Sequence, residues 1–154
     1  MGVIESKLQA LGLALPKAAP PAGNYLPAVR TGSLIFLSGH GPVNADGRLS
    51  VCGRLGEDLS LEQGYEAARL TALALLASLK REIVDLDRLT RVVKLLGMVR
   101  CTADFGQTPA VINGASDLLV ELYGERGRHA RSAVGMFELP FQIAVEIEMV
   151  VEAA

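Results

Sequence analysis

The C-terminal stretch at residues 143–152 alternates between apolar and acidic side chains, and no other segment limits the possible folds as strongly. In an extended strand, successive side chains point to opposite faces. One face then carries Ile143, Val145, Ile147, Met149 and Val151, and the other carries Glu146, Glu148 and Glu152. A strand of this kind packs its apolar face on a core and leaves its polar face open. The stretch therefore predicts a β-sheet that is covered on one side only.

Two helices that could cover this sheet are marked by their first residues. Ser60 and Gln63 have the spacing of a capping box, and apolar residues then recur at helical spacing over 61–79. The pair Thr108-Pro109 is typical of an N-cap followed by proline in the first helical turn, and Gly124 is a candidate C-cap. We therefore expect one helix after Ser60 and a second between Pro109 and Gly124.

The remaining chain is predicted to form further strands and an N-terminal extension. Apolar or β-branched runs predict strands at 25–30, 33–38, 89–101 and 131–137, and the turn residues 44–47 indicate a hairpin region at 43–52. Residues 6–13 are a short helix candidate, and a Pro- and Ala-rich connector follows at 16–24. We expect strand 131–137 to pair with the alternating strand as a terminal hairpin.

These elements predict the α+β class, with a single mixed sheet and two helices packed on one face. A length of 154 residues suits one domain over residues 1–154, with residues 1–24 as its extension. The open face would carry the glutamates and Arg131, yet the run at 33–38 is apolar on both of its faces. Exposed apolar patches are usually interaction sites, so we expect self-association through this face in a cyclic assembly.

Composition excludes several classes of partner. Lys and Arg number 15 against 17 for Asp and Glu, so the net charge of −2 gives no basic excess for nucleic acid. The most apolar window, residues 70–79, is shorter than the roughly 20 residues that span a bilayer. Cys52 and Cys101 are expected to be free thiols in a reducing compartment. We expect a cytoplasmic protein without membrane or nucleic-acid contacts.

Short motifs follow one another along the chain in a specific order. They are Asn24-Tyr25, Ser38-Gly39, Pro42-Val43-Asn44, the Asp46-Gly47 turn, Arg131-Ser-Ala-Val, Leu139-Pro140 and Val145-Glu-Ile-Glu148. Together they resemble the YjgF/RidA family, which includes the liver perchloric-acid-soluble proteins, over residues 20–152. The first residues and the segment 112–119 are similar to a longer branch that carries an endoribonuclease label. The resemblance implies a chorismate-mutase-like fold, a homotrimer with three clefts between subunits, and no metal or organic cofactor.

The best-known activity that this resemblance implies is hydrolysis of 2-imino acids, and of their enamine tautomers, to 2-keto acids and ammonia. Arg131 would bind the substrate carboxylate through two parallel hydrogen bonds. Glu146 would orient a water molecule and accept its proton. Gly39 and Ala133 would contribute backbone groups, and Tyr25 would line the cleft. Many relatives have cysteine at position 133, and alanine keeps the backbone contact there.

His40 and Asn113 are two further candidates for substrate binding. His40 stands where the family commonly has glutamine, and it could add a group that titrates near pH 7 at the cleft mouth. Asn113 is the nearest match to an asparagine that contributes from the second helix in some relatives. Structural interpretations stay open: Arg131 could pair with a strand glutamate, the glutamates could be solvated, and Tyr25 and His40 could be packing residues.

Three functions are therefore compatible with the resemblance. The first is the imine deaminase, and the second is a non-catalytic trimer that binds small carboxylates in the same clefts. The third is an endoribonuclease or translation inhibitor, as the older family label suggests. The low aromatic content and the lack of an evident histidine pair for acid–base cleavage argue against the third. One arginine would serve both of the first two functions, so the sequence does not separate them.

Overall fold

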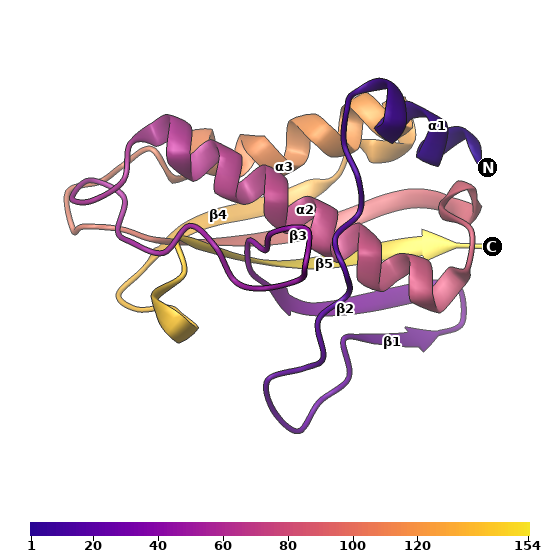
Figure 1. The fold of residues 1–154 in the computed structure, drawn as a ribbon, viewed down its shortest axis with the longest axis horizontal. Coiled ribbons are helices and arrows are strands. Elements are labelled where there is room, and N and C mark those ends of the chain that lie inside the picture. The colour runs from indigo at the N-terminus through magenta and orange to yellow at the C-terminus, as the bar shows by residue number, and fades with distance from the viewer.

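The alternating strand lies in the middle of a five-stranded sheet in the computed structural model, which describes residues 1–154 (Figure 1). The strands are β1 (Ala28–Thr31), β2 (Leu34–His40), β3 (Leu89–Arg100), β4 (Ala130–Met136) and β5 (Val145–Ala153). Their order across the sheet is β1-β2-β5-β3-β4. Only β3 and β4 run parallel, and the other neighbouring strands are antiparallel. The single mixed sheet expected from the sequence is thus confirmed.

The expected terminal hairpin is wrong, because β4 and β5 are not neighbours. β5 pairs with β2 on one side and with β3 on the other, whereas β4 joins the free edge of β3. A parallel pair of strands needs a crossover connection, and the second long helix supplies it between β3 and β4. The expected hairpin region at 43–52 forms no regular strand: it has the isolated antiparallel bridge Val43–Leu49, and Cys52 forms a second bridge to Ile143.

Two long helices, α2 (Leu61–Ile83) and α3 (Thr108–Tyr123), cover one face of the sheet (Figure 1). The capping box of α2 is confirmed, because the Gln63 amide donates to Ser60 Oγ at 3.2 Å and the Ser60 amide to Gln63 Oε1 at 2.8 Å. The N-cap predicted at Thr108 is wrong, since Gln107 takes that position and the Thr108 hydroxyl donates to the Ala133 carbonyl. None of the helices combines the length and apolar composition that a membrane span requires.

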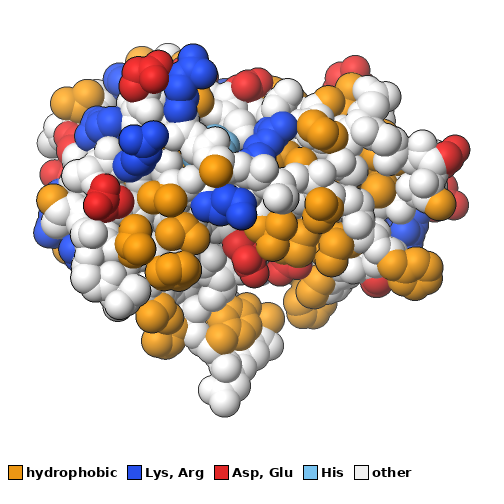
Figure 2. All heavy atoms as spheres, turned by 180° about the vertical axis from the view of Figure 1, so that it is seen from behind, with side chains coloured by type: hydrophobic (Ala, Val, Ile, Leu, Met, Phe, Trp, Pro, Cys, Tyr) orange, Lys and Arg blue, Asp and Glu red, His pale blue; other side chains and the backbone are white.

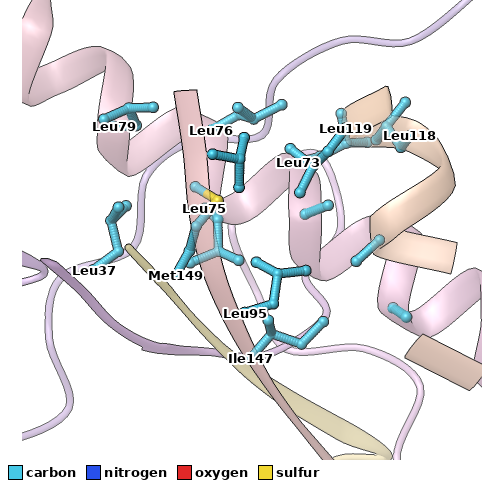
Figure 3. Close-up of a cluster of buried hydrophobic side chains, with 14 of the residues drawn as sticks. Leu37, Leu73, Leu75, Leu76, Leu79, Leu95, Leu118, Leu119, Ile147 and Met149 are labelled. Atoms are coloured by element: carbon cyan, nitrogen blue, oxygen red, sulfur yellow. The ribbon is translucent and has the colours of Figure 1, made fainter. Parts of the chain in front are cut away.

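The core lies between these helices and the sheet (Figure 3). The apolar face of β5 is completely buried there, which confirms the face predicted from the alternation. Close packing depends on two glycines. A Cβ at Gly97 of β3 would lie 2.6 Å from Ile112 of α3, and one at Gly114 would collide with the Tyr65 carbonyl of α2. Glycine at both positions therefore lets α3 lie directly on β3 and against α2.

The opposite face of the sheet has no cover. On β2, Ile35 and Leu37 point into the core, whereas Phe36 points outward and is 46% exposed. Val29 of β1 and Val134 of β4 are also exposed, at 52% and 42%. Figure 2 shows this side of the molecule, where hydrophobic side chains gather around a few charged ones. This apolar exposure matches the surface expected from the run at 33–38.

A third helix, α1 (Val3–Ala10), begins earlier than the predicted 6–13 and packs against the end of α3. The Asp87 carboxylate, from the 3₁₀ turn η1 (Leu86–Arg88), accepts hydrogen bonds from the amides of Val3 at 2.6 Å and Ile4 at 2.8 Å. It thereby satisfies two of the free N–H groups of the first helical turn. Further contacts are the Glu5–Lys80 ion pair, the Lys7 Nζ bond to the Leu122 carbonyl, and burial of Ile4 and Leu8.

We predict that Asp87→Ala lowers the free energy of unfolding by about 1 kcal/mol, because two amides of α1 lose their acceptor. The bonds from Ile4 and Val3 hold the pKa of Asp87 below its ordinary value of 3.8. Its contribution is therefore present at neutral pH and is lost as the pH falls through the lower pKa of the folded state. Urea unfolding at pH 7 and pH 3 measures both effects.

The exposed residue Glu82 of α2 provides the matched control, since it forms no ion pair. Glu82→Ala should change the stability by less than about 0.5 kcal/mol. Equal stability of Asp87→Ala and the unmodified chain at pH 7 would show that Asp87 does not hold α1.

Candidate functional site

A cleft of about 740 Å³ is lined by segments that are far apart in the sequence. One wall is residues 17–23 of the connector (residues 16–24), which runs down from α1 across α2 and the lower strands in Figure 1. The other lining segments are residues 38–41 at the end of β2, the loop 43–49, the turn 140–143, and Glu146 and Glu148 of β5. The cleft thus combines an acidic strand face with several loops.

Glu146 is the half-buried carboxylate of this cleft. Gly39 packs directly on it, and a Cβ at position 39 would collide with the Glu146 carboxylate. No cation lies within ion-pair distance of Glu146, and its oxygens make no hydrogen bond within the chain. Burial raises the pKa of the Glu146 carboxyl, and the charge of Glu148 raises it further. Glu146 is therefore suited to accept a proton from a bound molecule.

Tyr25 and His40 also line the cleft. The Tyr25 hydroxyl accepts a hydrogen bond from the Ala22 amide at 3.2 Å, so it supports the connector. The Nδ1–H group of His40 donates to the Ser38 carbonyl at 2.6 Å, and its Nε2 accepts from the Ser78 hydroxyl at 2.7 Å. These partners assign the neutral tautomer, and burial lowers the pKa of His40. His40 thus links β2 to α2 and is uncharged at pH 7.

Arg131 lies outside this cleft, on the edge strand β4. Its Nη1 donates to Asn113 Oδ1 at 2.8 Å and to Ser116 Oγ at 3.0 Å, and its Nη2 donates to the Pro109 carbonyl at 3.2 Å. Of the five N–H donors of a guanidinium, Nε–H and one Nη2–H stay free. No carboxylate lies within ion-pair distance, so the alternative in which Arg131 pairs with a strand glutamate is wrong.

A serine and a histidine extend this arrangement. Since the Nδ1–H group of His129 donates to the Gly127 carbonyl at 2.7 Å, its Nε2 accepts the Ser116 hydroxyl proton at 2.9 Å. Ser116 thus accepts from Arg131 and donates to His129. Burial lowers the pKa of His129, and the charge of Arg131 adds to this. The sequence analysis missed Ser116, although its spacing of three from Asn113 places both on one helix face.

The predicted site residues therefore fall into two groups. Tyr25, Gly39, His40 and Glu146 meet in the cleft, whereas Asn113, Arg131 and Ala133 meet where β4 packs on α3. Arg131 aligns with the core residue Leu95, so it lies on the helix side of the sheet rather than on the open face, where it was expected. Glu146 lies on the open face of β5, which is two strands away from β4. Two strand spacings amount to about 10 Å between the backbones of β4 and β5. A small ligand cannot contact both side chains of one chain.

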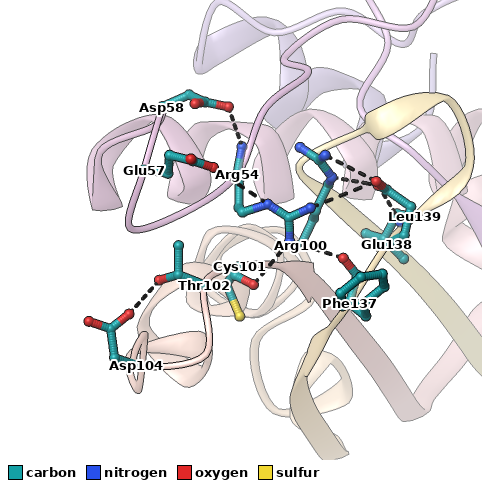
Figure 4. A network of polar contacts seen from close by, with 10 residues as sticks. All are labelled: Arg54, Glu57, Asp58, Arg100, Cys101, Thr102, Asp104, Phe137, Glu138 and Leu139. Atoms are coloured by element: carbon teal, nitrogen blue, oxygen red, sulfur yellow. Dashed lines mark hydrogen bonds and ion pairs between the residues drawn. The ribbon is translucent and has the colours of Figure 1, made fainter.

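A separate polar network holds the turn between β4 and β5 (Figure 4). Arg100 of β3 binds both oxygens of Glu138, with Nη2 3.1 Å from Oε2, and holds the pKa of Glu138 below its usual range. Arg54 donates to the Phe137 carbonyl at 2.9 Å. The network precedes Phe141, which lines the cleft and has an unusual left-handed backbone with φ of 57°. No cluster of three His, Cys, Asp or Glu side chains that could hold a metal forms in the chain.

The comparisons with known proteins agree with this fold. Residues 5–151 match the model of the family described as "YjgF/chorismate mutase-like, putative endoribonuclease". Protein TCP17 of Trypanosoma cruzi is 43% identical over 152 residues, which cover 98% of this chain and 94% of that protein. These matches confirm the resemblance found in the sequence motifs.

Solved structures give the same result. The protein Atu1372 of Agrobacterium tumefaciens has a TM-score of 0.92 and 42% identity, over 99% of this chain and 93% of its own. A "putative endoribonuclease" of Shewanella oneidensis has a TM-score of 0.94 and 35% identity. The match covers 98% of this chain and 99% of that protein. More distant chains share the fold alone. Among them, TdcF of E. coli with bound serine has a TM-score of 0.62 and 20% identity. The match covers 90% of this chain and 93% of TdcF.

We predict that both imidazoles titrate below the ordinary histidine pKa of 6.5, because burial disfavours their charged forms. The chain has only two histidines, so an NMR titration with His40→Gln and His129→Gln resolves each signal. The folded state resists protonation, so the free energy of unfolding should decrease as the pH falls below 6.5. The double variant should lose this part of the pH dependence, and a signal that titrates above 6.5 would contradict the described bonds.

Proposed function

The chain belongs to the YjgF/chorismate mutase-like family, and we propose that it hydrolyses 2-imino acids to 2-keto acids and ammonia in a site shared between subunits. The enamine tautomers of these acids would react through the same imine. The observation that carries this proposal is the pair of unsatisfied groups, Glu146 and Arg131. Glu146 is a half-buried carboxylate without a cation, and Arg131 is a positioned guanidinium without a carboxylate.

The two groups fit the two needs of imine hydrolysis. The free Nε–H and Nη2–H donors of Arg131 would bind the substrate carboxylate and fix the position of the C=N carbon. Glu146 would accept a proton from water as the water oxygen bonds to that carbon. The protonated carboxyl then gives this proton to nitrogen, which forms a carbinolamine. Glu146 takes the second proton from the carbinolamine hydroxyl and passes it to the amine, so C=O forms as the C–N bond breaks and ammonia leaves. Water and imine are consumed, and ammonia and keto acid leave, so Glu146 ends unprotonated.

The separation of the two groups supports a site built from two copies. A ligand held by Arg131 of one subunit can reach Glu146 only if the edge strand β4 lies beside the cleft of a neighbour. The exposed Phe36, Val29 and Val134 on the open face supply apolar surface for such a contact. A closed ring repeats the same contact at every junction, and we propose the homotrimer that the family resemblance implies. We propose the cytoplasm as its compartment, because the two cysteines are free.

The described contacts favour catalysis over the other two functions. A module that only binds carboxylates has no need of Glu146, because a half-buried carboxylate in the same cleft would repel them. Cleavage of RNA by general acid–base catalysis is disfavoured, since both nitrogens of His40 and of His129 are already hydrogen-bonded. The E. coli TdcF structure with bound serine supports a small ligand that carries a carboxylate on this fold.

We predict that this protein accelerates ammonia release from imines that an amino-acid oxidase forms in situ. Arg131→Ala should abolish the acceleration because the carboxylate loses its cation, and Glu146→Gln should abolish it because water loses its base. Both variants should keep the oligomeric mass measured by light scattering. Arg81→Ala, an exposed arginine of α2, is the matched control and should keep full activity. Ligand binding without acceleration by the unmodified protein would favour the non-catalytic module.

A mixture of the two inactive variants tests the shared site directly. In a random equal mixture, half of the subunits keep Arg131 and half of their neighbours keep Glu146, so about one quarter of the sites are complete. Co-expressed Arg131→Ala and Glu146→Gln chains should therefore recover about one quarter of the unmodified activity. Variants combined without subunit exchange should stay inactive. No recovery in verified mixed oligomers would show that each site lies within one chain.

We further predict a shift in the pH profile when Glu148 loses its charge. The ionised form of Glu146 is the proton acceptor, so kcat/KM should decrease as the pH falls through its raised pKa. Glu148→Gln removes a neighbouring negative charge, which lowers the pKa of Glu146. The acidic limb of kcat/KM should then move to lower pH while Glu152→Gln leaves it in place. A limb that does not move in Glu148→Gln would exclude Glu146 as the titrating base.

A further inference from the structure

The surface that lines the cleft is mostly apolar, and its polar side chains are Lys17, Tyr25, Ser38, His40, Glu146 and Glu148. The connector contributes two prolines, small alanines and Gly23 to the lining, and Lys17 stands at its start. The rest of the lining includes Val43 and Leu49 from the loop and Phe141 and Ile143 from the turn. Glu146 therefore borders a space in which most of the lining surface favours hydrocarbon.

The cleft is also larger than a three-carbon substrate needs. Its volume of about 740 Å³ falls within the range of pockets that enclose drug-sized ligands. A ligand with a one-carbon side chain would leave most of the apolar wall in contact with water. A branched or aromatic side chain would instead cover that wall and gain binding free energy from each buried methylene group.

The connector wall has a fixed position. The Lys17 amide donates to the Ala45 carbonyl at 3.0 Å, and a Cβ at Gly47 would lie 2.5 Å from the Lys17 carbonyl, so only glycine fits there. At the other end, the Tyr25 hydroxyl holds the Ala22 amide. Between these points, residues 18–21 make no hydrogen bond, and their two prolines restrict the backbone. Docked α1 holds the chain that leads into this wall.

From these observations we infer that residues 18–22 are the specificity-determining wall of the site, and that the cleft selects 2-imino acids with large apolar side chains. This inference rests on the proposed function and adds the substrate class to it. The carboxylate and the reacting carbon lie at the Glu146 end, and the side chain extends along the connector toward Leu49 and Phe141.

The substrate class restricts the reaction that supplies it. An amino acid with a leaving group on Cβ, such as serine, forms an imine by elimination, and this route gives small imino acids. Leucine, methionine and phenylalanine have no such leaving group. Their imines form when the amine and Cα lose two electrons and two protons to an oxidant, as in reactions of amino-acid oxidases. We therefore expect the substrate to come from an oxidation of amino acids rather than from an elimination.

Two stable 2-keto acids, phenylpyruvate and pyruvate, test the selectivity by calorimetric binding to the assembled protein. The unmodified protein should bind phenylpyruvate at least about tenfold more tightly. Ala19→Phe fills the connector side of the cleft and should weaken phenylpyruvate binding about tenfold while changing pyruvate binding less than about twofold. Ala14→Phe, at an exposed position just before the connector that does not line the cleft, is the matched control and should change neither.

A second variant approaches the same space from the other wall. Leu49→Ala removes apolar surface of the loop that lines the cleft, so phenylpyruvate binding should weaken about threefold to tenfold with little effect on pyruvate. Imines from phenylalanine and alanine should follow the same order in turnover by the unmodified protein. Circular dichroism and the oligomeric mass verify that each variant is folded.

The outcomes separate this inference from the proposed function. Equal binding of both keto acids, or an unchanged preference in folded Ala19→Phe and Leu49→Ala, overturns the inference. In that case, imine turnover that depends on Arg131 would still support the deaminase. Selective binding of phenylpyruvate without turnover of any imine supports the connector wall and overturns the deaminase.

Discussion

The alternation along β5 is the constraint on which the rest of the structure depends. β5 is the central strand, so its apolar face must be covered, and α2 and α3 provide the cover across glycines that allow close contact. Because side chains alternate, the same requirement places Glu146 and Glu148 on the face that no helix covers. A carboxylate without a cation is thus a consequence of how the core is built, and the cleft loops then enclose it partly.

The parallel strand β4 explains why Arg131 and Glu146 lie apart within one chain. After the crossover through α3, β4 can join only the free edge of β3, and its Arg131 turns toward the helix that preceded it. Helix contacts then orient the guanidinium without consuming all of its donors. Folding therefore keeps Arg131 and Glu146 apart, and in the proposed function assembly of several copies would be the step that joins them. Such a division makes the proposed chemistry a property of the oligomer.

The sequence predicted the elements whose signals are local. The capping residues and periodicity located α2, and the alternation located β5 and both of its faces. Strand pairing was not predictable in this way, because the neighbours of β5 depend on the global arrangement of the core, and the expected hairpin with β4 was wrong. The prediction that Arg131 lies on the open face of the sheet was wrong for the same reason. The spacing of Ser116 from Asn113 was the only sequence signal for its contact with Arg131. The connector as a lining of the cleft had no such signal, because a Pro/Ala run resembles ordinary surface.

The way in which the connector is held has a consequence for the history of such proteins. Its anchors are the Lys17–Ala45 backbone bond, Gly47 and the Tyr25 hydroxyl, so the alanines between them contribute little to the core. Mutations at these alanines can accumulate under weak selection for stability while they reshape the space beside Glu146. A lineage could thus acquire a new ligand preference through a handful of neutral or nearly neutral changes, and the reacting groups would stay as they are. The fold thereby separates the part that evolution can vary freely from the part that it must keep.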